Sequence, residues 1–78
     1  MATREQNERR FKCWRQEASG GRTYWYDVPG RQGWSARYLK SVDEGEATLR
    51  VWQEIRDADG RLRSVHQKFP TDTGHQDV

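Results

Sequence analysis

The side chains that could do chemistry in this sequence are few and widely separated. Cys13 is the only cysteine. No catalytic signature surrounds it, so we expect a structural thiol buried in the fold. His66 and His75 are the only histidines, and neither has the Cys-pair or His-x-x-x-His spacing of a zinc site. Folding could bring them together with Asp72, so His66, Asp72 and His75 form a candidate polar site.

Two further chemical motifs are absent or incomplete. The segment Asp57-Ala58-Asp59-Gly60 resembles the opening of a calcium-binding loop. Position twelve of such a loop should supply a glutamate, but Lys68 stands there, which favours a hairpin turn. The sequence also lacks the glycine-rich motifs that hold phosphate groups. We therefore predict that the protein is not an enzyme and uses no metal and no cofactor.

Aromatic residues supply much of the apolar content of the chain. Among its 78 residues 32% are apolar and 33% are charged, yet there are four Trp, three Tyr and two Phe. Each such side chain can bury roughly 150–250 Å². We expect one folded domain with a thin core, of a size that often depends on oligomerisation for stability.

Clusters of turn-forming residues divide the chain at regular intervals. They occupy residues 19–21, 29–33, 43–46 and 57–60. Residues 22–28, 34–42, 47–56 and 61–69 lie between or after them, and apolar and polar residues tend to alternate there, as expected for half-buried strands. Because tight turns join antiparallel strands, the sequence predicts an all-β fold: an antiparallel meander of four to five strands, as a curled sheet or a small barrel.

Both ends of the chain leave alternatives open. Thr3 followed by Gln6 could form a capping box and start a short N-terminal helix. Alternatively, residues 9–17 could form a strand with Phe11 and Cys13 on one side and Trp14 on the other, and we favour this strand. We expect a flexible segment over residues 1–8, one β domain over 9–70 and a polar tail over 71–78.

Alternation along the strands assigns the side chains to two faces. One face is the predicted core, with Phe11, Cys13, Tyr24, Tyr26, Val28, Trp34, Ala36, Tyr38, Val42, Leu49, Val51, Ile55, Val65 and Phe69. The other face carries three Trp and a Leu among polar residues that include Lys12, Glu54, His66 and Lys68. We identify it as a candidate binding face, made of Trp14, Trp25, Arg37, Leu39, Arg50, Trp52 and Arg56.

Three interpretations of this second face stay open. The Trp side chains could cap a small barrel. They could form an interface, since Trp and Arg are enriched at interface hot spots, and self-association would enlarge a poor core. As an alternative, they could stack on the bases of single-stranded RNA or DNA. Our main prediction is a homodimer or a complex with another protein.

Charge and hydropathy bear on the location of the protein. The net charge is +2, and both signs are interspersed along the chain. No apolar run approaches the roughly 20 residues that span a bilayer, and the N-terminus has no apolar core of a signal peptide. We expect a cytoplasmic protein without a membrane partner.

One set of segments resembles a known type of protein. It comprises Tyr24-Trp25-Tyr26-Asp27-Val28-Pro29-Gly30, Gly33-Trp34-Ser35-Ala36-Arg37-Tyr38, His66-Gln67-Lys68-Phe69-Pro70 and Asp72-Thr73-Gly74-His75. This pattern resembles small uncharacterised prokaryotic proteins grouped as a domain of unknown function. The resemblance implies no activity. It does imply that residues 68–75 dock onto the domain.

Overall fold

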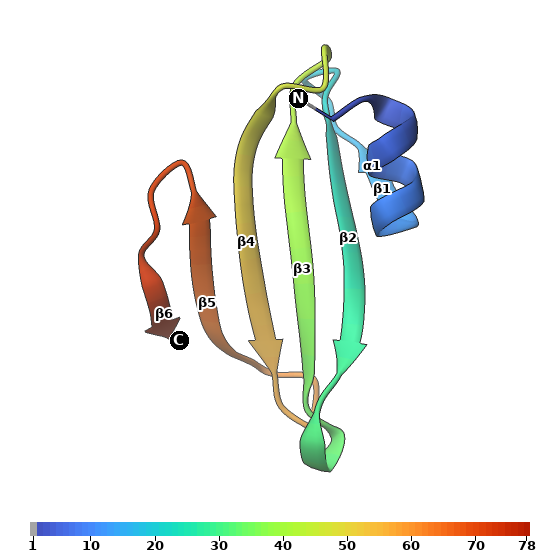
Figure 1. The fold of residues 1–78 in the computed structure, drawn as a ribbon. Helices are drawn as coiled ribbons and strands as arrows, with labels where there is room; N and C mark the ends of the chain where they lie inside the picture. Colours follow the sequence, from blue (N-terminus) through green and yellow to red (C-terminus); the bar gives the residue numbers. More distant parts are fainter. Residues whose placement is uncertain (1) are drawn as a thin grey trace.

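The computed structural model describes residues 2–78, which form one antiparallel sheet with a short helix at its N-terminal end (Figure 1). Between the second and third strands lies one 3-10 turn, Arg31–Gly33. The elements are α1 (Arg4–Phe11), β1 (Cys13–Gln16), β2 (Arg22–Pro29), β3 (Ser35–Val42), β4 (Thr48–Arg56), β5 (Leu62–Phe69) and β6 (Gly74–Asp77).

Helix α1 occupies most of the segment that we expected to be flexible. Its N-terminus is a complete capping box, in which the Thr3 hydroxyl accepts from the Gln6 amide and the Gln6 side chain accepts from the Thr3 amide. Lys12 adopts a left-handed conformation, with φ of 69°, and ends the helix. The predicted strand over 9–17 was therefore wrong in its first half, and only Cys13–Gln16 is extended.

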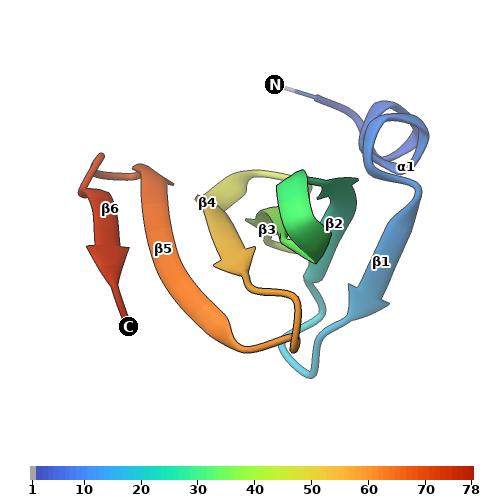
Figure 2. The same ribbon diagram turned by 90° about the horizontal axis from the view of Figure 1, so that it is seen from below.

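The sheet is a simple meander with the strand order β1-β2-β3-β4-β5-β6. It has six strands, one more than the largest number predicted, because the polar tail supplies β6, which pairs with β5. The sheet is strongly twisted and curled, but β1 and β6 remain its two edges, so the barrel alternative was wrong (Figure 2). The helix lies in front of one face of this curled sheet.

Cross-strand pairing defines two faces, since directly paired residues point to the same side. We call the side that contacts α1 the helix face; it carries Trp14, Tyr24, Tyr26, Tyr38, Lys40, Val42, Val51, Gln53, His66 and His75. We call the other side the open face; it carries Cys13, Trp25, Asp27, Arg37, Leu39, Arg50, Trp52, Glu54, Arg56, Val65 and Gln67.

The core between α1 and the sheet is small. Phe11 packs on Tyr24, with ring centroids 5.9 Å apart, and Val42 completes the buried cluster. Beside it, the buried carboxylate of Glu46 accepts hydrogen bonds from Asn7 of the helix and from Tyr24 of β2. These contacts fasten the helix to the sheet.

Among residues 2–78, no helix has the length and apolar character needed to cross a membrane.

Candidate functional site

An apolar row crosses the centre of the open face. Trp25 of β2 pairs with Leu39 of β3, and Leu39 pairs with Trp52 of β4. Leu39 is only 8% exposed, because an indole ring flanks it on each side, whereas both tryptophans are half-buried. Helix α1 packs against the opposite face, and residues 2–78 form no other α-helix. The row is therefore an apolar surface that no helix covers.

Arginine side chains lie directly over this row. The Arg50 guanidinium is 4.3 Å from the centroid of a Trp52 ring, and the Arg37 guanidinium is 5.5 Å from a ring of Trp25. Such contacts combine a cation–π attraction with apolar coverage by the arginine stem. The face thus presents two indoles, each with a cation at its surface.

Carboxylates balance Arg37 and Arg56 on this face, whereas Arg50 donates to the uncharged side chain of Gln67. Arg37 donates two hydrogen bonds to Asp27, at 2.7 and 3.1 Å, and this contact holds the pKa of Asp27 below its ordinary value. Glu54 accepts from Arg56 and from the Trp52 indole. The open face therefore has both signs of charge around an apolar centre.

Six of the seven residues predicted for the binding face do lie on the open face. The exception is Trp14, which pairs with Tyr24 on the helix face and is 41% exposed there. Cys13 was predicted in the core, but it pairs with Trp25 on the open face and is exposed. The prediction of a buried thiol was therefore wrong. The cause is Lys12, whose left-handed backbone resets the alternation between the helix and β1.

The candidate polar site is brought together at the turn between β5 and β6. His66 Nε2 lies 2.7 Å from Asp72 Oδ1, and the rings of His66 and His75 are 4.8 Å apart. His66 was predicted on the open face, but it pairs with Gln53 on the helix face. Val65 was predicted in the core, but it pairs with Glu54 on the open face. A bulge in the pairing of β4 with β5 explains both errors.

The geometry of this cluster is that of a structural turn. Asp72 accepts hydrogen bonds from the Gly74 backbone amide and from His66. Both bonds hold the pKa of Asp72 below its ordinary value, and the bond from Gly74 has the larger effect. His75 is paired separately, with Ser64, at 3.4 Å. Among the described residues 2–78, no group of three His, Cys, Asp or Glu could hold a metal ion. The cluster closes the β5–β6 turn.

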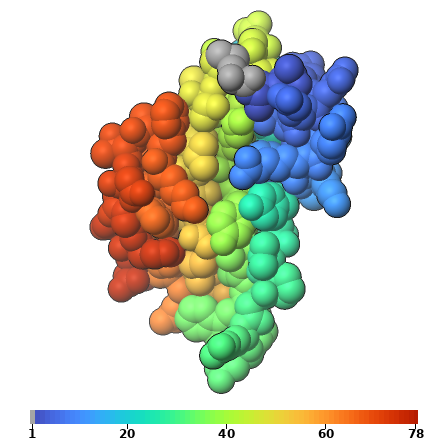
Figure 3. Space-filling view, in the orientation of Figure 1, coloured from blue at the N-terminus to red at the C-terminus, as the bar shows by residue number. Residues whose placement is uncertain are grey.

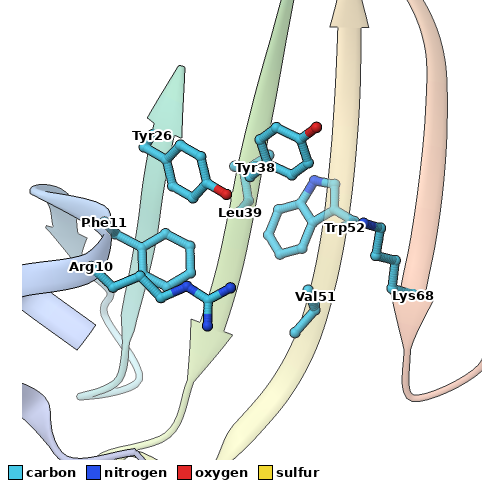
Figure 4. A pocket seen from close by; sticks show the side chains of 8 residues that line it. All are labelled: Arg10, Phe11, Tyr26, Tyr38, Leu39, Val51, Trp52 and Lys68. Atoms are coloured by element: carbon cyan, nitrogen blue, oxygen red, sulfur yellow. The ribbon is translucent and has the colours of Figure 1, made fainter. Parts of the chain in front are cut away.

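A pocket on the helix face was not predicted. It has a volume of about 180 Å³ and opens between α1 and β5. The space-filling view shows the corresponding hollow, with the helix on one side and β5 and β6 on the other (Figure 3). Its lining combines aromatic rings with two cations: Arg10, Phe11, Tyr26, Tyr38, Leu39, Val51, Trp52 and Lys68 (Figure 4).

The tyrosines of this pocket were expected to lie in a filled core. The alternation correctly placed Tyr26 and Tyr38 on the inner side. However, α1 is only eight residues long and contacts β1 and β2, so it leaves the middle of the sheet uncovered. The signal that could have revealed the pocket is the shortage of apolar residues available to cover so many aromatic rings.

Comparison of the chain with protein-family models, with curated proteins and with solved structures gave no match. Function is therefore inferred from the geometry of the two faces of the sheet.

Proposed function

We propose that this protein is a non-enzymatic binding module that forms a homodimer through its open face. The observation that carries the proposal is the row Trp25–Leu39–Trp52 in the middle of a sheet face that no helix covers. An apolar centre with a polar rim is the usual anatomy of a protein interface, and Trp and Arg are its most common hot-spot residues.

The charges on this face favour a second copy of the chain as the partner. A two-fold interface brings the same patch of both subunits together, so each patch must complement itself. The open face meets this condition, because Asp27 pairs with Arg37 and Glu54 with Arg56, while Arg50 donates to the uncharged Gln67. The carboxylates would repel the phosphates of a nucleic acid, which makes that alternative the weaker one for this face.

The thin core gives an energetic reason to associate. Among the described residues 2–78, only four apolar side chains are buried: Phe11, Tyr24, Leu39 and Val42. The exposed surface is 5445 Å², whereas a monomer of this mass is expected to expose roughly 5,000 Å². A standard interface covers about 800 Å² on each partner, so dimerisation would remove a large apolar area from water.

Sedimentation equilibrium of the Trp25→Ala variant tests the proposal, because Trp25 lies on the open face and does not line the pocket. A hot-spot tryptophan typically contributes about 2 kcal/mol or more, so the dimer should dissociate at least about 30-fold more readily. Trp34→Ala is the matched control: Trp34 is exposed, outside the row, and should leave the dimer intact. Equal effects of the two substitutions would refute the assignment of the interface.

A further inference from the structure

We propose that the pocket on the helix face binds a nucleotide unit, with its planar base against the stacked pair of Tyr26 and Tyr38 and its phosphate between Arg10 and Lys68. The pocket shares Leu39 and Trp52 with the row of the open face, whereas its tyrosines and its two cations take no part in that row.

The floor of the pocket is an aromatic pair, because Tyr26 and Tyr38 stack on each other and leave only their outer sides to a ligand. The Lys68 ammonium lies 5.5 Å from the centroid of the Tyr38 ring. The rings of Tyr26 and Tyr38 lie 5.0 Å apart and nearly parallel, at 19°, because the two residues are direct cross-strand partners. Phe11 adds a third ring, 5.5 Å from Tyr26. The Tyr38 hydroxyl accepts a hydrogen bond from Gln53, which fixes the ring. Flat rings held in this way are the surfaces on which nucleic-acid bases stack.

The two cations of the pocket line it without a carboxylate between them, although Lys68 lies close enough to Asp72 to help lower the pKa of that carboxyl. Arg10 approaches from the end of α1 and Lys68 from β5, so they stand on opposite sides of the aromatic floor (Figure 4). Neither forms an ion pair with any of the described residues 2–78, and no carboxylate lines the pocket. The open face is different, because carboxylates pair there with Arg37 and Arg56.

Arg10 also acts on a second cation of this face. The pKa of Lys40 is lowered, first by burial and then by repulsion from Arg10, and the Glu46 carboxylate partly opposes this. An anion placed between Arg10 and Lys68 would relieve this repulsion. Aromatic rings flanked by cations without carboxylates together select a ligand that is both planar and anionic, which is the chemistry of a nucleotide.

The size of the pocket suggests how much of the ligand it holds. Sites that enclose a whole small molecule usually measure about 300–1,000 Å³, and this one measures about 180 Å³. It would take one ring system and leave the sugar and phosphate at the rim. Beyond Tyr38, the same cross-strand row continues through Gln53, His66 and His75, which extends a polar track toward β6. A free nucleotide and one unit of a single strand would use the same contacts.

The test is a titration of the full chain with two probes: AMP, followed by calorimetry, and a fluorescein-labelled hexamer of adenosine ribonucleotides, followed by anisotropy. The double variant Arg10→Glu/Lys68→Glu should bind at least about tenfold more weakly, because each phosphate contact is electrostatic. The matched control is Arg9→Glu/Arg61→Glu, which changes the net charge equally at exposed positions outside the pocket. It should bind within about twofold of the wild type.

A second pair of variants tests the aromatic floor. Tyr38→Ala should weaken binding by about tenfold, whereas Tyr38→Phe keeps the ring and should bind almost normally. Tight binding of the hexamer with weak binding of AMP would support the site and identify a single strand as its ligand. Equal binding of both probes would support it and identify the free nucleotide. Absence of binding by both, or an equal loss in the Arg9/Arg61 control, would overturn the proposal.

Discussion

Replacing Glu46 by alanine should loosen the attachment of helix α1 to the sheet. Glu46 is 7% exposed, and its carboxylate accepts hydrogen bonds from three side chains. Arg4 donates at 2.8 Å, Asn7 at 3.0 Å, and the Tyr24 hydroxyl lies 2.9 Å from the nearer oxygen. Burial raises the pKa of Glu46, but the bonds from Arg4, Asn7 and Tyr24 outweigh it and leave the pKa below its ordinary value.

The expected cost follows from the burial of the donors. Tyr24 is 0% exposed and Asn7 is 1% exposed, so both would lose a buried acceptor. Each unsatisfied buried group costs about 1–3 kcal/mol. Arg4 is half exposed and adds little, since water replaces its partner. Allowing for partial relaxation, Glu46→Ala should lower the free energy of unfolding by roughly 2–4 kcal/mol. This corresponds to a fall in Tm of roughly 8–30 °C for a domain of this size.

Urea and thermal unfolding followed by circular dichroism measure this change. Glu44→Ala is the matched control, because Glu44 lies in the same turn but is exposed, and it should change the free energy of unfolding by less than about 0.5 kcal/mol. The lowered pKa of Glu46 also makes the stability of the fold depend on pH. Since its folded-state pKa is lowered, its contribution is complete above the ordinary carboxyl pKa and is lost as the pH falls through the folded-state value. A Glu46→Ala variant as stable as the wild type would refute the reasoning.

The remaining predictions concern the helix and the β5–β6 turn. Phe11→Ala should destabilise the domain by about 3–5 kcal/mol, because Phe11 is the main apolar contact of α1, and urea unfolding would measure this. Thr3→Ala removes the capping box and should cost about 1 kcal/mol in the same assay; no change would mean that the cap is dispensable. Because the pKa of Asp72 is lowered, amide exchange of β6 should stay slow above the ordinary carboxyl pKa and quicken as the pH falls through the lowered value. Exchange that is unaffected by pH, after correction for its intrinsic rate, would contradict this role.

Most of the architecture could be predicted from turn chemistry and alternation. The four predicted turn clusters all connect neighbouring elements, and β2 and β3 have the predicted faces. In β4 the predicted faces hold only from Arg50 onward, because a bulge pairs Thr48 with Val42 and leaves Leu49, expected in the core, 53% exposed. Helix α1 was not favoured at the sequence level because its buried side has few apolar residues: one of its two buried positions is held by the polar Asn7. Strand β6 was missed because its segment is polar and pairs through backbone hydrogen bonds with β5.

The candidate site was predictable only where the alternation is uninterrupted. Trp25, Leu39 and Trp52 lie in the regular middle of their strands, so their common face followed from period two. Trp14 follows a left-handed residue and His66 follows a bulged pairing, and neither irregularity has a sequence signal as clear as a glycine. The pocket depends on how far α1 extends over the sheet, which alternation does not encode.

Light scattering coupled to size exclusion, at low and moderate salt, is the measurement that tests the central claim most directly. Because the proposed interface has an apolar centre, a homodimer should give a mass near twice the 9.3 kDa of the chain at both salt concentrations. A mass near 9.3 kDa across the accessible protein concentrations would contradict the claim that the open face is a self-association surface.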